Sequence, residues 1–176
     1  MFLLFTETTS HFVNVSNNLQ ELTETSICKL TGLCEAASEN ELKLIEKAIT
    51  TISAKNIDVN PISDKLSPEV LKSMEIDNSY NLCSSKIQLL RPVKVLSEKK
   101  TWELVLNNAE FEQAIRVKIC KAPEKPCNWP SQPNYKSWCH QEYSSRILYS
   151  VRLDGTIFKE NFQIPSGCCC YGKWLE

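Results

Sequence analysis

Hydrophobic residues recur at helical spacing between residues 39 and 55. They follow one another at steps of three and four and form a stripe of Leu42, Ile45, Ala48, Ile49 and Ile52. Ser38 and Glu41 precede the stripe in the S-x-x-E order of a capping box, in which both side chains bond free amides at a helix start. The pattern predicts one amphipathic helix over about residues 39–55. Its stripe needs a partner surface, and the body of the same protein is the simplest candidate.

Beyond Cys83 the period of the hydrophobic pattern changes from helical to two-fold. A first run alternates with polar residues through Trp102, Leu104 and Leu106. Asn107-Asn108 interrupts it, and Phe111 and then a second alternating run of Ile115, Val117 and Ile119 follow. We expect these two runs to pair as a β-hairpin.

A second hairpin is predicted over residues 147–164. Its first strand alternates through Ile147, Tyr149, Val151 and Leu153, and its second places Phe158, Phe162 and Ile164 on one face. Asp154-Gly155 lies between the strands and favours a type I′ turn, in which both central residues need a positive φ. Between the two hairpins, residues 121–138 form a loop whose prolines exclude a central strand.

Composition divides the chain into two parts. Residues 57–80 are mostly polar, contain two X-Pro turns and read as a linker, and we place the domain boundary after Lys72. Residues 1–72 carry six basic and ten acidic side chains, whereas residues 73–176 carry fourteen and eleven. We therefore expect an acidic pro-segment, loosely structured apart from its helix, that helps to cover a basic all-β domain.

The chain contains nine cysteines, and seven of them lie in the second part. They are Cys28, Cys34, Cys83, Cys120, Cys127, Cys139, Cys168, Cys169 and Cys170. Structural zinc sites use thiolate or imidazole ligands in short C-x2-4-C pairs, and no such pair occurs, so we expect neither a metal nor a cofactor. The density of cysteines indicates a disulfide scaffold instead.

Disulfide bonds place the folded protein outside the reducing cytosol, so we expect secretion. The apolar stretch at the N-terminus, Met1 to Phe5, is shorter than the core of a signal peptide, and nothing else is long enough to span a membrane. Asn14-Val15-Ser16 is a glycosylation sequon, which fits a secreted protein.

Strand geometry limits how the last cysteines pair. On a strand, residues two apart point the same way, so Cys168 and Cys170 face one neighbouring strand while Cys169 faces away. Cys120 and Cys127 are plausible partners for that pair. Six cysteines allow about fifteen pairings, and the sequence alone does not choose among them.

Several short sequence motifs, taken together with the cysteine spacing, are specific enough to compare with a known family. They are Trp102 to Asn108, Gln113-Ala114-Ile115, Pro126-Cys127, Cys139-His140-Gln141 with Tyr143, and Phe162 to Ser166. Together they resemble the Spätzle family, the arthropod ligands of Toll receptors, over about residues 83–172. The resemblance implies a neurotrophin-type cystine knot built of two long hairpins. Residues 1–72 match the family only in their role as a variable pro-segment.

The same resemblance implies the disulfide pairing. The knot bonds would be Cys83–Cys139, Cys120–Cys168 and Cys127–Cys170. The family's interchain cysteine falls at Gly167 in this chain, which leaves Cys169 to link two protomers into a homodimer, with Cys168 as the alternative if the pairing shifts by one residue. Cys28 and Cys34 are expected to bond each other.

Activation is implied by the resemblance as well. A clip-domain serine protease would cut after a basic residue shortly before the first knot cysteine, for which Lys72-Ser73 is our first choice and Lys65 the second. The cleaved dimer would bind the leucine-rich ectodomain of a Toll receptor in innate immunity or development. Trp102 is expected either to contact the receptor or the pro-segment or to be a core residue of the hairpin, and Trp129 and Trp138, placed in the proline-rich loop, are further candidates.

Catalysis is not expected. Cys139-His140 is the one candidate nucleophile pair, but adjacent strand residues diverge and Cys139 is needed for the knot. No nucleophile elbow, phosphate loop or zinc-protease motif occurs, and neither nucleic acid nor membrane is expected as a partner. Two other functions fit the same features: a neurotrophic growth factor for another receptor, and a secreted disulfide-rich inhibitor or antimicrobial protein.

Overall fold

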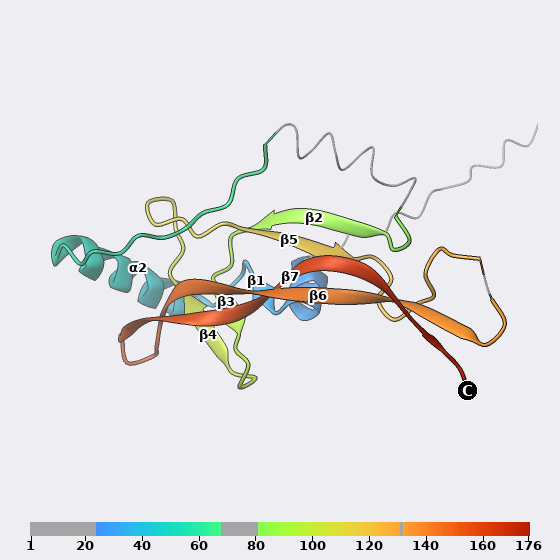
Figure 1. Cartoon of the computed structure of the whole chain (residues 1–176). Coiled ribbons are helices and arrows are strands. Elements are labelled where there is room, and N and C mark those ends of the chain that lie inside the picture. The colour runs from blue at the N-terminus through green and yellow to red at the C-terminus, as the bar shows by residue number, and fades with distance from the viewer. Residues whose placement is uncertain (1–23, 68–80, 131) are drawn as a thin grey trace, which may run out of the picture.

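The computed structural model describes residues 24–67, 81–130 and 132–176. The N-terminal range contains α1 (Glu24–Thr31), β1 (Leu33–Cys34) and α2 (Glu39–Ala54). The later ranges contain β2 (Ser85–Leu90), β3 (Lys94–Leu96), β4 (Trp102–Val105), β5 (Ile115–Cys120), β6 (Tyr135–Val151) and β7 (Ile157–Trp174). These elements confirm a small, disulfide-bonded β domain with a helical segment upstream (Figure 1). Within these ranges, no helix has the length and apolar character needed to cross a bilayer.

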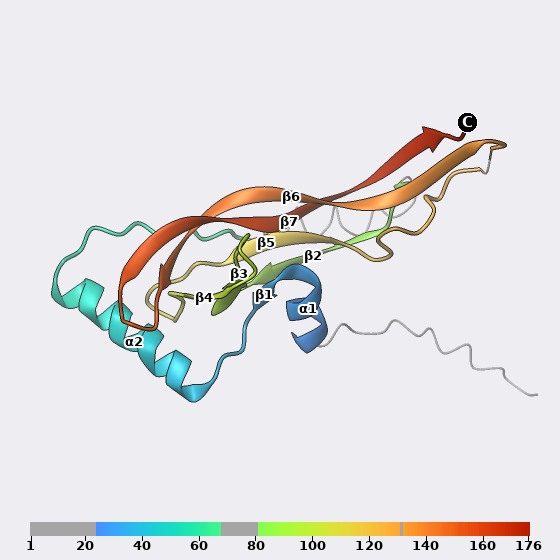
Figure 2. The same ribbon diagram turned by 90° about the horizontal axis from the view of Figure 1, so that it is seen from below.

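Two antiparallel sheets make up the body of the protein. The larger has the strand order β1-β3-β4-β6-β7, and the smaller pairs β2 with β5. β5 packs against β7, so the small sheet covers the middle of the long β6–β7 ribbon (Figure 1). Apolar side chains from both sheets meet there, among them Val105, Ile115, Val117 and Phe162. Beyond this core the ribbon continues to the C-terminus, at the end opposite α2 (Figure 2).

The second predicted hairpin is confirmed, but its turn differs from the prediction. β6 and β7 pair from Val151↔Ile157 to Tyr135↔Trp174. Gly155 alone has a positive φ, of 85°, and its amide donates to the carbonyl of Arg152, whose own amide donates to the carbonyl of Thr156. This is a three-residue loop ending in a glycine bulge, not a type I′ turn, because Asp154 stays outside the left-handed region. Leu153 consequently lies at the tip, 84% exposed, rather than on the apolar face.

The first predicted hairpin is wrong. β4 pairs with β3 and β6, whereas β5 pairs with β2 in the other sheet. The chain between them crosses from one sheet to the other. Two buried side-chain amides form hydrogen bonds with the backbone of this connection. Asn107 donates to the carbonyls of Pro92 and Gln113, and Gln113 donates to those of Leu106 and Tyr149. These bonds satisfy the polar groups of an irregular buried connection, which a tight turn would not need.

The proline-rich loop is shorter than the predicted 121–138. β6 begins at Tyr135, two residues after Pro133, which is the last proline of the loop. Once the prolines end, every backbone amide is able to join the ladder, so residues 135–138 extend the ribbon. Trp138 therefore belongs to a strand and not to the loop.

Helix α2 is confirmed at Glu39–Ala54, one residue shorter than expected. The capping box is present: the Glu41 amide donates to the Ser38 hydroxyl, and the Ser38 amide donates to the Glu41 carboxylate. Ile45, Ala48, Ile49 and Ile52 are buried against Val93, Leu104, Leu106, Phe111 and Val151. Leu42, counted in the stripe, is 41% exposed and does not belong to this buried cluster.

Residues 24–35 are more ordered than the expected loose segment. α1 and β1 are joined by the Cys28–Cys34 disulfide, and β1 adds a strand to the edge of β3 through Leu33↔Val95. Leu33 is only 1% exposed and packs in the core between the sheets. One apolar residue between a helix and a cysteine gives too short a pattern to predict a strand.

Candidate functional site

The knot cysteines come from five different parts of the β domain. Cys83 precedes β2, Cys120 ends β5, Cys127 lies in the following loop, and Cys139 and the 168–170 run lie side by side on β6 and β7. The disulfides are Cys83–Cys139, Cys120–Cys168 and Cys127–Cys170, the same bonds that the family resemblance implies. The Sγ atoms of Cys83 and Cys127 are 3.7 Å apart, so these two bonds pack directly against each other.

Three sulfur atoms in this cluster are close enough to resemble a metal site. The Sγ atoms of Cys83, Cys127 and Cys139 lie within 4.8 Å of one another. Each of them is in a disulfide, and a metal ligand has to be a free thiolate. The same bonding leaves the Cys139-His140 pair without a nucleophile. His140 points to the other face of β6, where its Nδ1 is 3.3 Å from the Glu124 Oε1.

Cys169 is the free cysteine of the described residues, and it is exposed. Because strand side chains alternate, it faces away from Cys168 and Cys170. Its Sγ donates a hydrogen bond to the Glu142 Oε2 at 3.2 Å. That bond, together with partial burial and the negative charge of Glu142, raises the pKa of the thiol, while Lys118 opposes the shift. The thiol is therefore protonated at neutral pH.

Glu142 also binds Tyr171 and shifts its pKa. The Tyr171 hydroxyl donates to the Glu142 Oε1 at 3.3 Å, and the charge of the carboxylate raises the pKa of the phenol. Nothing in the sequence singles out Glu142. Its role follows from the ribbon register, which places it opposite Gly167 and one position along the same face from the His140–Cys169 pair.

We expect Glu142→Gln to lower the pKa of Cys169 and to increase several-fold its rate of reaction with a disulfide reagent at pH 8. The uncharged amide removes both the charge repulsion and the carboxylate acceptor that favour the protonated thiol. The rate is measured by absorbance of the released thiol. Glu124→Gln is the control, since Glu124 contacts His140 and not Cys169. Equal rates in Glu142→Gln and the unmodified protein would contradict this role.

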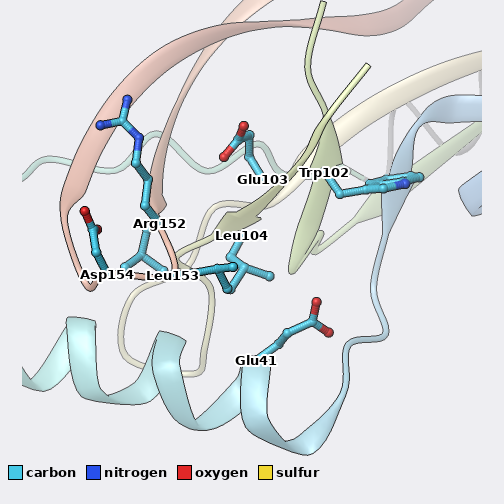
Figure 3. A pocket seen from close by; sticks show the side chains of 8 residues that line it. Glu41, Trp102, Glu103, Leu104, Arg152, Leu153 and Asp154 are labelled. Carbon is cyan, nitrogen blue, oxygen red and sulfur yellow. The ribbon is translucent and has the colours of Figure 1, made fainter. Parts of the chain in front are cut away.

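The three tryptophans predicted as contacts lie in different settings. Trp129 is 51% exposed in the proline-rich loop, and Trp138 is half-buried on β6, where it stacks on Tyr171 with ring centroids 6.4 Å apart. Trp102 is 45% exposed at the start of β4 and lines a pocket of about 490 Å³. Figure 3 shows the other walls of this pocket: Glu41 from α2, and Arg152, Leu153 and Asp154 from the β6–β7 loop.

The same pocket borders an ion pair that ties α2 to the sheet. The Lys94 Nζ lies 2.9 Å from the Glu41 Oε1. The hydrogen bond from Lys94 and those from Ser38 lower the pKa of Glu41 from 4.5 to about 2. Because the folded pKa is depressed, the stabilisation is complete above pH 4.5 and is lost as the pH falls from 4.5 towards 2.

Glu41→Gln is expected to weaken the attachment of α2 by about 0.5–1 kcal/mol, the contribution of a partly exposed ion pair. Glutamine still completes a capping box, so the helix start is retained. Hydrogen exchange of the α2 amides at pH 6 measures the loss, and the difference from the unmodified protein shrinks as the pH falls towards 2. The control is Glu39→Gln, which removes only the Glu39–Lys43 pair within the helix. A pH-independent difference would contradict the assignment.

A second anchor follows α2. Asp64 lies in the extended chain that the sequence assigns to the linker. Its carboxylate accepts from Arg146 Nη2 at 2.8 Å and from the Arg116 amide at 2.9 Å, and its own amide donates to the carbonyl of Ala114. Lys65 is exposed immediately after this anchor. A lone aspartate in a polar stretch gives no sequence signal of such a contact.

Two predicted sites fall outside the described residues. These are the Lys72-Ser73 cleavage site and the Asn14 glycosylation site.

The sequence of this chain is similar to those of known proteins. The Spaetzle family model matches residues 80–172, which include all seven cysteines of the β domain. A Drosophila melanogaster protein named Protein spaetzle is 36% identical over 93 residues, 51% of this chain and 28% of the relative. Neurotrophin 1 from the same organism is 24% identical over 115 residues, 65% of this chain and 13% of the relative. The chain thus spans under a third of the length of either relative.

One solved structure is similar over part of the chain. It is described as the crystal structure of the spatzle cystine knot, with a sequence identity of 27% and a TM-score of 0.36. The match covers 56% of this chain and 98% of that one.

Proposed function

This chain belongs to the Spaetzle family, and from that membership we propose that it is the secreted precursor of a dimeric ligand that activates a Toll-type receptor after proteolysis. The observation that carries the proposal is the family match over residues 80–172, the region that holds the three knot disulfides and the free Cys169. Secretion, with glycosylation at Asn14, is part of the same proposal.

Cleavage after Lys72 by a clip-domain serine protease is the proposed activating step. Such an enzyme binds several substrate residues on either side of the cut bond as an extended strand. Lys65 follows Asp64, whose backbone and carboxylate are both engaged by the β domain, so a protease would have to displace that anchor to cut there. This favours Lys72, eleven positions before Cys83, over Lys65.

The receptor contact is proposed to include Trp102 and Trp129. Both indoles are about half exposed, and exposed aromatic side chains are frequent anchors at protein interfaces. Trp102 shares its pocket with Glu41 of α2, so the docked N-terminal segment limits access to one side of it. Removal or loosening of that segment after cleavage would widen the surface offered to a leucine-rich ectodomain.

The interchain bond of the dimer is proposed at Cys169. Its neighbour Cys168, the alternative, is engaged with Cys120 in the structure, which supports the first choice.

A Toll-dependent reporter in cultured cells tests the proposed function. We expect the protein treated with a trypsin-like protease to activate the reporter, and Lys72→Ala to lower that activity at least tenfold while Lys65→Ala leaves it unchanged. N-terminal sequencing of the product should begin at Ser73. Full reporter activity from Lys72→Ala would reject the cleavage site, and a response independent of Toll would favour a ligand for another receptor.

A further inference from the structure

A groove of about 620 Å³ lies between the N-terminal segment and the β domain, and it is here called the α1 groove. The end of α1 forms one wall, the connection from β3 to β4 forms a second, and side chains of the β6–β7 ribbon form a third. The α1 groove shares no lining residue with the pocket that Trp102 lines. Its volume is in the range of sites that hold small molecules, about 300–1,000 Å³.

Local structure fixes the helical wall of the α1 groove to the β domain. Gly32 ends α1 with a φ of 70°, a conformation that favours glycine, and its amide donates to the carbonyl of Cys28 at 2.9 Å. The Gly32 carbonyl accepts from the Leu96 amide at 2.8 Å. The Cys28–Cys34 disulfide closes the same turn. Two walls of the groove are therefore held together before any ligand binds.

Each wall of the α1 groove contributes one large apolar or aromatic side chain. Leu30 of α1 is 42% exposed, Tyr143 of β6 is 52% exposed, and Leu96 of β3 is half-buried. None of the three belongs to an apolar cluster of the described residues. An apolar ligand in the groove would remove part of this surface from water, which is favourable.

The charged side chains of the α1 groove are two lysines and one glutamate. Lys29 and Lys100 are exposed, and neither takes part in the ion pairs that the described side chains form. The Glu98 Oε1 accepts from the Gln163 Nε2 at 3.1 Å. Positive charge is therefore in excess by one, and both cations are free to bind an anion.

We propose that the α1 groove binds an amphipathic carboxylate of the fatty-acid class. The acyl chain lies against Leu30, Leu96 and Tyr143, and the carboxylate binds Lys29 and Lys100 through charge-assisted hydrogen bonds. A single negative charge matches the excess of one positive charge in the lining. A phosphate monoester carries up to about two negative charges at neutral pH and would be repelled more strongly by Glu98.

The position of the α1 groove couples the ligand to the N-terminal segment. Lys29 and Leu30 belong to that segment, whereas Leu96, Lys100 and Tyr143 belong to the β domain. The complete site therefore exists only while α1 is docked. A ligand that binds the docked state alone stabilises it, so the bound carboxylate holds the segment to the domain.

An amide chemical-shift titration of the uncleaved, isotope-labelled protein with sodium octanoate at neutral pH tests the site. We expect saturable shifts at the end of α1 and in the β3–β4 connection, with a Kd on the order of millimolar because the ligand has few atoms. 1-Octanol has the same chain and an uncharged head, and its shifts at equal concentration should be several-fold smaller. Acetate, which lacks the chain, should give no saturable shift there.

Substitutions in the lining should change octanoate affinity in opposite directions. Lys29→Ala and Lys100→Ala should each weaken binding about threefold, as loss of an exposed charge pair does, and together about tenfold. Glu98→Gln should strengthen binding about twofold, because it removes the repelling carboxylate. Lys99→Ala is the matched control, since Lys99 is exposed beside Lys100 but does not line the groove. Circular dichroism establishes that each variant keeps its fold.

Hydrogen exchange gives an independent arm of the experiment. Octanoate at ten times its Kd should raise the protection of the α1 amides about tenfold, and the double variant Lys29→Ala/Lys100→Ala should show no such gain at the same concentration. Unchanged α1 protection in the unmodified protein would overturn the shared site. Equal shifts with 1-octanol, or equal weakening by Lys99→Ala, would overturn the carboxylate contact. Neither receptor nor protease takes part, so the proposed Toll ligand function is tested separately by the cell reporter.

Discussion

Replacement of both Cys120 and Cys168 by serine is expected to lower the free energy of unfolding of the β domain by about 2–5 kcal/mol, the usual cost of a native disulfide in a small secreted domain. The Cys120–Cys168 bond closes a separation of 48 residues and joins β5 to β7 across the two sheets. Without it the unfolded chain gains conformational entropy. The apolar core of so small a domain contributes too little stability to compensate for this. Urea unfolding followed by tryptophan fluorescence measures the loss.

The control lies next to Cys168 in the sequence. Cys169→Ser should leave the free energy of unfolding within about 0.5 kcal/mol of that of the unmodified protein under conditions where it is monomeric, because Cys169 is exposed and unbonded. Two adjacent cysteines therefore differ only in the face of β7 that they occupy. If Cys169→Ser destabilised the domain as much as the double variant, the pairing would be shifted by one residue.

Ile49→Asp is expected to release α2 from the sheet while the cystine-knot domain stays folded. Ile49 is 4% exposed among Leu104, Leu106 and other apolar side chains, and a carboxylate there loses the apolar contact and its own hydration together. We expect a loss of about 3–5 kcal/mol in the attachment of the helix. Hydrogen exchange of residues 39–54, compared with residues 115–120, measures it.

Leu42→Asp separates this effect from a general change of helix charge. Leu42 is on the same helix but 41% exposed, and an acidic residue is favourable near a helix N-terminus. Its α2 amides should therefore keep the protection of the unmodified protein. Equal loss of protection in both variants would mean that the apolar stripe does not hold the helix to the β domain.

Local patterns predict the elements whose partners lie nearby in the sequence. α2 follows from its capping box and apolar stripe, and the β6–β7 hairpin follows from alternation on both sides of one glycine. The pairing of β4 and β5 does not, because alternation gives a strand its buried face but not its neighbour. The deciding feature is the buried amide pair of Asn107 and Gln113, which supports a crossing between sheets.

The candidate site also has features that the sequence predicts and features that it does not. Cysteine spacing and strand alternation place Cys168 and Cys170 together and leave Cys169 on the other face. The groups that surround Cys169 come from β6, and no feature of Glu142 or Tyr171 in the sequence indicates that both lie beside the thiol. The anchors Glu41–Lys94 and Asp64–Arg146 likewise join residues 53 and 82 positions apart, a pairing that single-chain patterns do not determine.

The proposed role of this protein as a cleavage-activated ligand is tested most directly by titrating a purified Toll leucine-rich ectodomain with two preparations. One is the intact protein, and the other is the same protein after cleavage at Lys72. The account predicts at least tenfold tighter binding by the cleaved protein, with a complex that contains the Cys169-linked dimer. Equal affinity for the two preparations, or no binding by either, would contradict it.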